Sequence, residues 1–93
     1  MSNKVRARIF VNGLVQGVFF RQNTQKRAKE IGVFGFVRNL QDGRVEAVFE
    51  GDRDKVKEII KWAKEGPNNA TVNNQEVSWE EYKEEFNDFE IKY

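Results

Sequence analysis

The order of two hydrophobic periods along the chain constrains its fold more than any other sequence feature. Apolar residues at every second position predict half-buried strands, and apolar residues three and four positions apart predict the buried face of a helix. Strand patterns cover residues 5–11, 34–40, 45–50, 71–79 and 89–93, and helix patterns cover residues 20–31 and 53–65. This order predicts an α+β fold, the ferredoxin-like α/β sandwich (βαββαβ), in which an antiparallel sheet carries two helices on one face.

Residues with special backbone preferences separate these segments. Gly32 follows the first helix pattern and Gly66-Pro67 follows the second, where each would stop a helix. Asp52 comes directly before the second helix pattern and is predicted to cap its N-terminus. Asp42-Gly43 lies between two strand patterns, which predicts a β-hairpin.

The composition fits one compact domain and excludes several kinds of chemistry. We expect the 93 residues to form a single domain, residues 1–93, because 39% of them are apolar and 13% aromatic. The chain has neither cysteine nor histidine. Disulfides, Cys/His zinc sites, a cysteine nucleophile, a phosphohistidine and a Ser-His-Asp triad are therefore excluded. No acidic cluster in the sequence suggests a metal site, and we expect no metal and no cofactor.

No segment is predicted to take the chain to a membrane. The charged residues Lys4 and Arg6 near the N-terminus are not followed by the apolar run of a signal peptide. No stretch approaches the roughly 20 apolar residues of a membrane span. We therefore expect a cytoplasmic protein, and a monomer as the simplest state.

The charge is divided unevenly between the two halves of the chain. Residues 1–44 hold nine Lys or Arg and two Asp or Glu, whereas residues 45–93 hold seven and thirteen, although the net charge of the whole chain is only +1. A basic first half is suited to bind an anion. A chance division of charge over a solvated surface would produce the same numbers.

One loop between a strand pattern and a helix pattern has the composition of an anion site. Gly13 and Gly17 bracket it, and Arg21 follows in the first turn of the predicted helix. Such a turn directs backbone N–H groups into one concavity, and the guanidinium fork fits two phosphate oxygens. It lacks the Gly-Lys-Ser/Thr ending of a nucleotide P-loop. Taken alone, these residues are equally typical of a tight turn with a surface arginine.

Asn39 is the second polar candidate. It lies near the end of the strand pattern at residues 34–40, just before the predicted hairpin. Its amide could contact a ligand, or it could simply cap the turn, which asparagine often does.

Two long motifs at consistent spacing resemble the acylphosphatase family. The run Gly13-x-Val15-Gln16-Gly17-Val18-x-Phe20-Arg21 is similar to the family's first signature, and Gly35-x-Val37-x-Asn39-x-x-Asp42-Gly43-x-Val45-Glu46 is similar to its second. The resemblance extends from residue 5 to residue 93, and the fold that it implies is the sandwich predicted above. Phe36 stands where tryptophan is more usual, and polar residues at 73–75 and 80–81 leave the length of the fourth strand open.

The resemblance implies an enzyme that hydrolyses the carboxyl–phosphate bond of small acyl phosphates without a metal. Arg21 would bind the phosphoryl group and Asn39 would hold the attacking water. The backbone amides of six residues would complete the phosphate cradle: Val15, Gln16, Gly17, Val18, Phe19 and Phe20. Inorganic phosphate would be product and competitive inhibitor. A carboxylate leaving group needs little general acid, which agrees with a chain that has no histidine.

Two alternatives come from other functional classes. An RNA-recognition domain shares the predicted fold, and residues 9–14 and 34–37 resemble parts of its aromatic motifs. However, the longer of those motifs belongs on the third strand rather than the second, and the chain is nearly neutral. A non-catalytic phosphate or carboxylate binder could use the same loop. Neither nucleic acid nor membrane is the partner that we expect.

Overall fold

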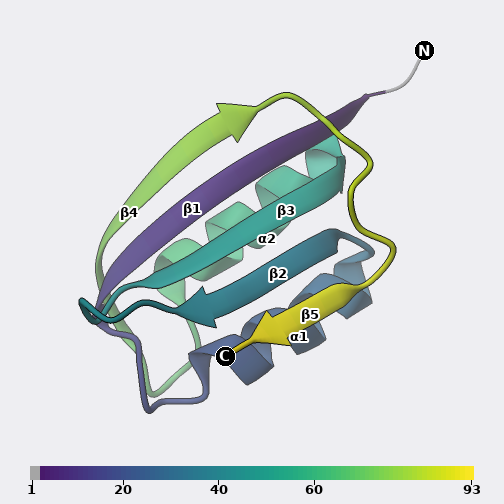
Figure 1. Cartoon of the computed structure of the whole chain (residues 1–93). Coiled ribbons are helices and arrows are strands. Elements are labelled where there is room, and N and C mark those ends of the chain that lie inside the picture. The colour runs from purple at the N-terminus through teal and green to yellow at the C-terminus, as the bar shows by residue number, and fades with distance from the viewer. Residues whose placement is uncertain (1–2) are drawn as a thin grey trace.

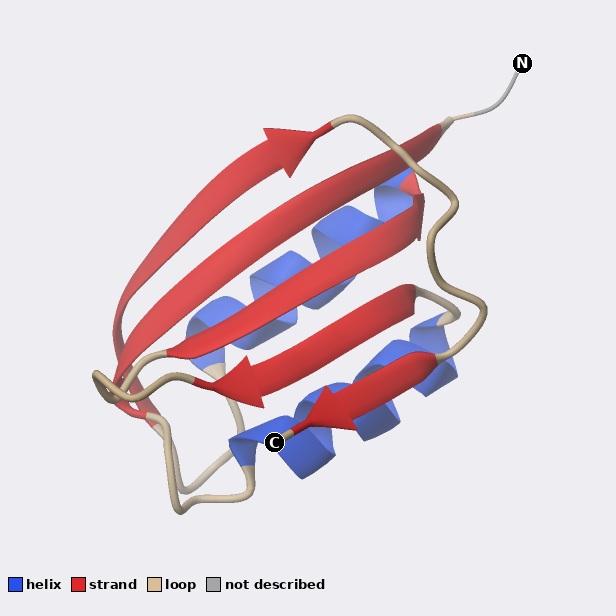
Figure 2. Ribbon diagram, in the orientation of Figure 1, coloured by secondary structure: helices blue, strands red, loops and turns tan. Residues whose placement is uncertain are grey.

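The structure, a computed structural model, describes residues 3–93 and contains five strands and two helices (Figures 1 and 2). Met1 and Ser2, which open the N-terminal segment discussed above, lie outside the described residues. The elements in chain order are β1 (Lys4–Leu14), α1 (Phe20–Ile31), β2 (Phe34–Asn39), β3 (Val45–Asp52), α2 (Arg53–Glu65), β4 (Thr71–Glu80) and β5 (Phe89–Lys92). The predicted order of strands and helices is confirmed.

The strands form one sheet in the order β4-β1-β3-β2-β5. The pairs β1–β3, β1–β4 and β2–β3 are antiparallel as predicted, whereas β5 pairs with β2 in parallel, so the sheet as a whole is mixed. The difference arises from the path of residues 81–88. This loop leads the chain from β4 at one edge of the sheet to the opposite edge, where β5 enters beside β2 (Figure 1).

β4 covers the predicted residues 71–79 and one residue more, despite its polar composition. It lies at an edge of the sheet and pairs with β1 alone. Asn73, Asn74 and Gln75 can occupy it because an edge strand keeps much of its surface in water. Gln75 also donates a hydrogen bond of 3.0 Å from Nε2 to the Ile60 carbonyl, which ties β4 to α2.

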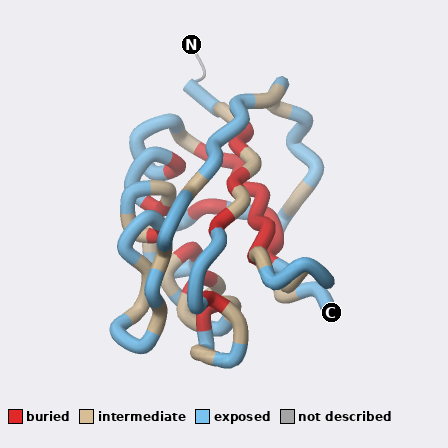
Figure 3. Tube along the Cα trace, turned by 90° about the vertical axis from the view of Figure 1, so that its left-hand side faces the viewer, coloured by how far each residue is buried: buried red, intermediate tan, exposed pale blue. Residues whose placement is uncertain are grey.

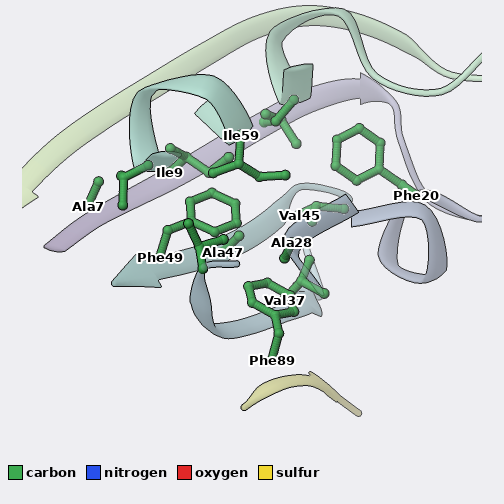
Figure 4. Close-up of a cluster of buried hydrophobic side chains, with 14 of the residues drawn as sticks. Ala7, Ile9, Phe20, Ala28, Val37, Val45, Ala47, Phe49, Ile59 and Phe89 are labelled. Atoms are coloured by element: carbon green, nitrogen blue, oxygen red, sulfur yellow. The ribbon is translucent and has the colours of Figure 1, made fainter. Parts of the chain in front are cut away.

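Both helices cover the same face of the sheet, and the core lies between these two layers (Figures 3 and 4). The alternating residues Ala7, Ile9 and Val11 of β1 point into it and are fully buried. The core also contains stacked rings from β3 and β5, since the centroids of Phe49 and Phe89 lie 5.7 Å apart. Burial of these side chains is the main source of stability for a chain without disulfides.

The start of α2 differs in detail from the prediction. Asp52 does occupy the N-cap position, but its carboxylate makes no capping hydrogen bond. It pairs instead with Lys4 Nζ at 2.9 Å. The backbone N–H of Arg53 donates to the carbonyl oxygen of Asn3 at 2.9 Å, so the start of α2 is joined to the start of β1.

The face of the sheet opposite the helices carries a network of charged side chains. Arg6, Glu46 and Glu50 are only 4%, 3% and 1% exposed. Arg6 donates to Glu50, Glu80 and Glu85, while Glu50 accepts the backbone N–H groups of Lys83 and Glu85 at 3.0 and 2.9 Å. The network therefore attaches the β4–β5 loop to this face.

Candidate active site

The loop between β1 and α1 begins at a position that requires glycine. Gly13 has φ of 126°, and a Cβ there would collide with the backbone carbonyl of Thr71 in β4. The pairing of β1 with β4 also shifts register between Asn12 and Gly13. This irregularity ends the regular strand and directs the chain out of the sheet.

Two residues in the left-handed region shape the rest of the loop. Gly17 has φ of 76° and Phe19 has φ of 63°. Left-handed residues among right-handed ones turn successive N–H groups toward one side, which makes a concavity that suits an anion. The conformation is easy for Gly17 but costs a side chain such as that of Phe19 about 1–2 kcal/mol.

The N-terminus of α1 is suited to an anionic ligand. Phe19 is the N-cap residue and provides no side-chain cap, and the first turn contains no acidic residue. The N–H groups of this turn and the positive end of the helix dipole are thus left for a ligand.

A cavity of about 140 Å³ lies at this helix start. One water molecule needs only roughly 10–15 Å³, so the cavity has room for a larger group. The lining residues come from the loop, the first turn of α1 and the end of β2: Val15, Gly17, Phe19, Phe20, Arg21, Gln22 and Asn39. The structure therefore brings Arg21 and Asn39, which are 18 positions apart in the sequence, to the same cavity.

The side chains of Gln16 and Val18 do not line the cavity. Val18 packs against the hydrophobic core. Gln16 Nε2 donates hydrogen bonds to the carbonyl oxygens of Leu40 at 2.8 Å and Arg44 at 3.0 Å. Gln16 thereby joins the loop to the β2–β3 hairpin, which lies at the same end of the molecule (Figure 1).

Asn39 is the last residue of β2 and pairs with Val45 of β3. Its Oδ1 atom is buried in the cavity wall and accepts no hydrogen bond from the described part of the protein. A buried acceptor without a donor costs roughly 1–3 kcal/mol. The amide oxygen therefore has an unused capacity to accept a hydrogen bond, in a residue that lines the cavity.

Arg21 lies in the first turn of α1 and is half-buried. Its guanidinium carbon stands 4.9 Å from the centre of the Tyr93 ring, a cation–π arrangement. No carboxylate within residues 3–93 forms an ion pair with Arg21. The Tyr93 ring carries no charge and is 97% exposed, so this contact leaves the charge of the guanidinium available to a ligand.

Sequence reasoning missed two features of this site. Gln22 lines the cavity but stands in no motif that was singled out, and Tyr93, the last residue of the closing strand pattern, contacts Arg21. The contact of Tyr93 depends on the parallel pairing of β5 with β2, which places the end of the chain beside the start of α1.

The described residues contain no group of three or more Asp or Glu side chains placed to bind a metal ion. Neither described helix is long and apolar enough to span a membrane. Arg21 is the charged residue among those that line the cavity.

Comparison with known proteins identifies the family. The sequence model of the family described as Acylphosphatase matches residues 7–91. An acylphosphatase of Pyrobaculum calidifontis is 60% identical over 88 residues, which make up 94% of this chain and 80% of that protein.

Solved structures agree with this result. An acylphosphatase from Coxiella burnetii has a TM-score of 0.91 at 37% identity, over 97% of this chain and 94% of that one. One from Bacillus subtilis has a TM-score of 0.91 at 34% identity, over 96% and 99%. Since sequence and fold agree over nearly the whole length, the chain belongs to the acylphosphatase family, hydrolases of acyl phosphates.

Proposed function

We propose that the chain hydrolyses acyl phosphates in the cavity at the start of α1, with Arg21 and Asn39 as catalytic residues and no metal. The observation that supports this most strongly is the meeting of three features at one cavity. These are an uncapped helix N-terminus, an arginine without a carboxylate partner, and a buried amide oxygen without a donor. The first two suit a phosphoryl group and the third suits a water molecule.

Backbone amides of residues 15–20 and the Arg21 guanidinium bind the phosphoryl oxygens. Phosphoryl transfer gains most from positioning and from stabilising charge on these oxygens, which both groups provide.

Asn39 orients the attacking water by accepting a hydrogen bond from it at Oδ1. The water oxygen forms a bond to phosphorus while the bond from phosphorus to the acyl oxygen breaks, and the carboxylate leaves with the electron pair. We propose that a phosphoryl oxygen takes the proton of the water, because neither histidine nor cysteine is present in the chain. A carboxylate is a weak base and can leave without a protein acid.

The face of the sheet opposite the helices supports hydrolysis over RNA binding. RNA-recognition domains stack bases on exposed aromatic side chains of this face. Here Glu46 and Glu50 lie buried in it, and the Arg44 guanidinium covers the ring of Phe10 at 4.8 Å. Glu46 and Glu50 form ion pairs with the arginines of this surface, so these guanidinium groups are not free to bind a nucleic-acid backbone.

The remaining expectations are part of the same proposal. We expect inorganic phosphate to be both product and competitive inhibitor, because it fills the cradle without an acyl group. We also propose that the chain works as a monomer in the cytoplasm.

The test is hydrolysis of benzoyl phosphate in the presence of EDTA, with wild type and Asn39→Ala. We expect turnover by the wild type that EDTA leaves unchanged. In Asn39→Ala, kcat should fall by roughly two to three orders of magnitude while phosphate still inhibits competitively. If a folded wild type does not hydrolyse the substrate, the cavity is only a phosphate-binding site. If phosphate no longer binds to Asn39→Ala, Asn39 does not act through the water.

A further inference from the structure

We infer that Phe19 is the acyl-binding wall of this site, so that the enzyme prefers acyl phosphates with an aromatic or bulky apolar acyl group to those with a small one. The inference rests on the proposed function, because it assigns the phosphoryl group to the cradle. It adds the part of the substrate that the cradle does not contact.

Phe19 is the one exposed apolar side chain that lines the cavity. Its exposed fraction is 64%, whereas the other apolar side chains of the lining, Val15 and Phe20, are 1% and 2% exposed and belong to the core. The remaining lining residues are glycine or polar. An apolar group that extends from the cavity toward solvent therefore has one apolar surface to lie on.

Local structure gives no reason for phenylalanine at position 19. The residue adopts φ of 63°, which glycine or asparagine takes more easily. It is also the N-cap residue of α1, where its side chain cannot cap. Most of its ring is in water, so the core gains little from it. A side chain that is unfavourable in all three respects is more readily explained by contact with a ligand.

The direction of the substrate places its acyl group near this ring. The backbone amides and Arg21 hold the phosphoryl end inside the cavity, and Asn39 in its wall holds the water. The acyl group must therefore leave through the open mouth, where the exposed ring of Phe19 lies. An aromatic acyl group can stack on the ring, whereas an acetyl or carbamoyl group is too small to cover it.

The test compares kcat/KM for benzoyl phosphate with kcat/KM for acetyl phosphate in wild type, Phe19→Asn and Phe19→Tyr. Both substrates carry the same phosphoryl group, so any disturbance of the cradle cancels in this ratio. Asparagine accepts the left-handed backbone, and tyrosine restores an aromatic ring. We expect the ratio to fall by roughly five- to tenfold in Phe19→Asn and to stay near the wild-type value in Phe19→Tyr.

Leu14→Asn is the matched control. Leu14 is 57% exposed at the end of β1 but does not line the cavity, so its loss should leave the ratio unchanged. If folded Phe19→Asn turns over neither substrate, calorimetric titration with phenylphosphonate and methylphosphonate measures the same preference without catalysis.

Each outcome has one meaning. An unchanged ratio in Phe19→Asn, or an equal fall in Leu14→Asn, overturns the role of Phe19 and leaves the proposed hydrolysis intact. A folded wild type that hydrolyses neither substrate overturns the proposed function and this inference together. A fall confined to Phe19→Asn, with recovery in Phe19→Tyr, supports the inference.

Discussion

Arg21 shows how much depends on the shape of one side chain. Its positive charge could be supplied by lysine, but lysine is a point charge and lacks the planar fork that fits two phosphoryl oxygens. Lysine would also lose the flat contact with the Tyr93 ring, which lies 4.9 Å from the guanidinium carbon. Charge and geometry can therefore be separated by a single substitution.

We predict that Arg21→Lys lowers kcat/KM for benzoyl phosphate by about two orders of magnitude and weakens inhibition by phosphate. Arg27→Lys is the control, because Arg27 lies on the same helix and pairs with Glu30 and Glu58 at 3.5 and 3.8 Å. Steady-state kinetics with phosphate as inhibitor would measure both effects. Normal activity in a folded Arg21→Lys would mean that charge alone is sufficient.

The sequence was a good guide to the residues of the site and a poor guide to their conformations. Arg21 and Asn39 were identified by motifs, and the structure places both at the cavity. The left-handed backbone of Phe19 could not be predicted, because most sequence rules assign that conformation to glycine or asparagine. The contact of Arg21 with Tyr93 depends on a pairing between distant strands, which local patterns do not contain.

At the scale of elements, Gln16 links the loop that forms the cradle to the hairpin that positions Asn39. Its amide donates to two carbonyl oxygens beyond the end of β2, Leu40 and Arg44. The cavity needs both elements, since the loop provides amides and β2 provides Asn39. The link therefore joins the loop that we propose as the cradle to the hairpin next to Asn39.

We predict that Gln16→Ala lowers kcat by roughly tenfold, because the loop and the hairpin are no longer held in a fixed relative position. The effect on global stability should be smaller. Gln25→Ala is the control, since Gln25 Nε2 also donates to a backbone carbonyl, that of Phe89 at 3.1 Å, on the core side of α1. Kinetics combined with urea unfolding would separate the two effects. An equal loss of kcat in both variants would show that Gln16 has no special role.

Periodicity predicted the elements well because side-chain burial follows the geometry of strands and helices. It could not give the direction of β5. This direction depends on which edge of the sheet is free and on how residues 81–88 cross to it. The hydrophobic pattern of an edge strand says little about its direction, since only one side of the strand is paired.

At the scale of the whole molecule, the face of the sheet opposite the helices has a buried network of charged side chains and, in the span that the structure describes, no second layer of helices. Burial by itself raises the pKa of Glu50, but the N–H groups of Lys83 and Glu85 and the Arg6 guanidinium more than offset this and hold the pKa below its usual value. Hydrogen bonds from Arg8 and Arg6 similarly lower the pKa of Glu80. Both carboxylates are therefore charged in the folded protein at neutral pH.

These shifts predict loss of stability in acid. The folded pKa values of Glu50 and Glu80 lie below the reference value of 4.5, so their contribution is complete above that pH and decreases as the pH falls below it. We expect Glu50→Gln to lose about 1.5–3 kcal/mol of unfolding free energy at pH 7. Between pH 4.5 and pH 2, the unfolding free energy of this variant should depend less on pH than that of the wild type.

Urea unfolding at several pH values would measure this, with Glu58→Gln as the control. Glu58 is exposed and lies 3.8 Å from Arg27, so Glu58→Gln should alter the free energy of unfolding by only a few tenths of a kcal/mol. If both variants have the same acid profile as the wild type, the network does not govern acid stability.

The place of β1 between β3 and β4 also determines when this site comes into existence. β1 is made first, but its partner strands are Val45–Asp52 on one side and Thr71–Glu80 on the other. The apolar face of β1 therefore stays unburied until most of the chain has been synthesised. The cradle must also wait for β4, because Gly13 and Leu14, the last residues of β1 before the cradle, are paired with Val72 and Thr71. Pairings so distant in sequence close slowly. During refolding, enzyme activity should therefore return only when the whole sheet has formed, so the recovery of activity reports completion of the fold.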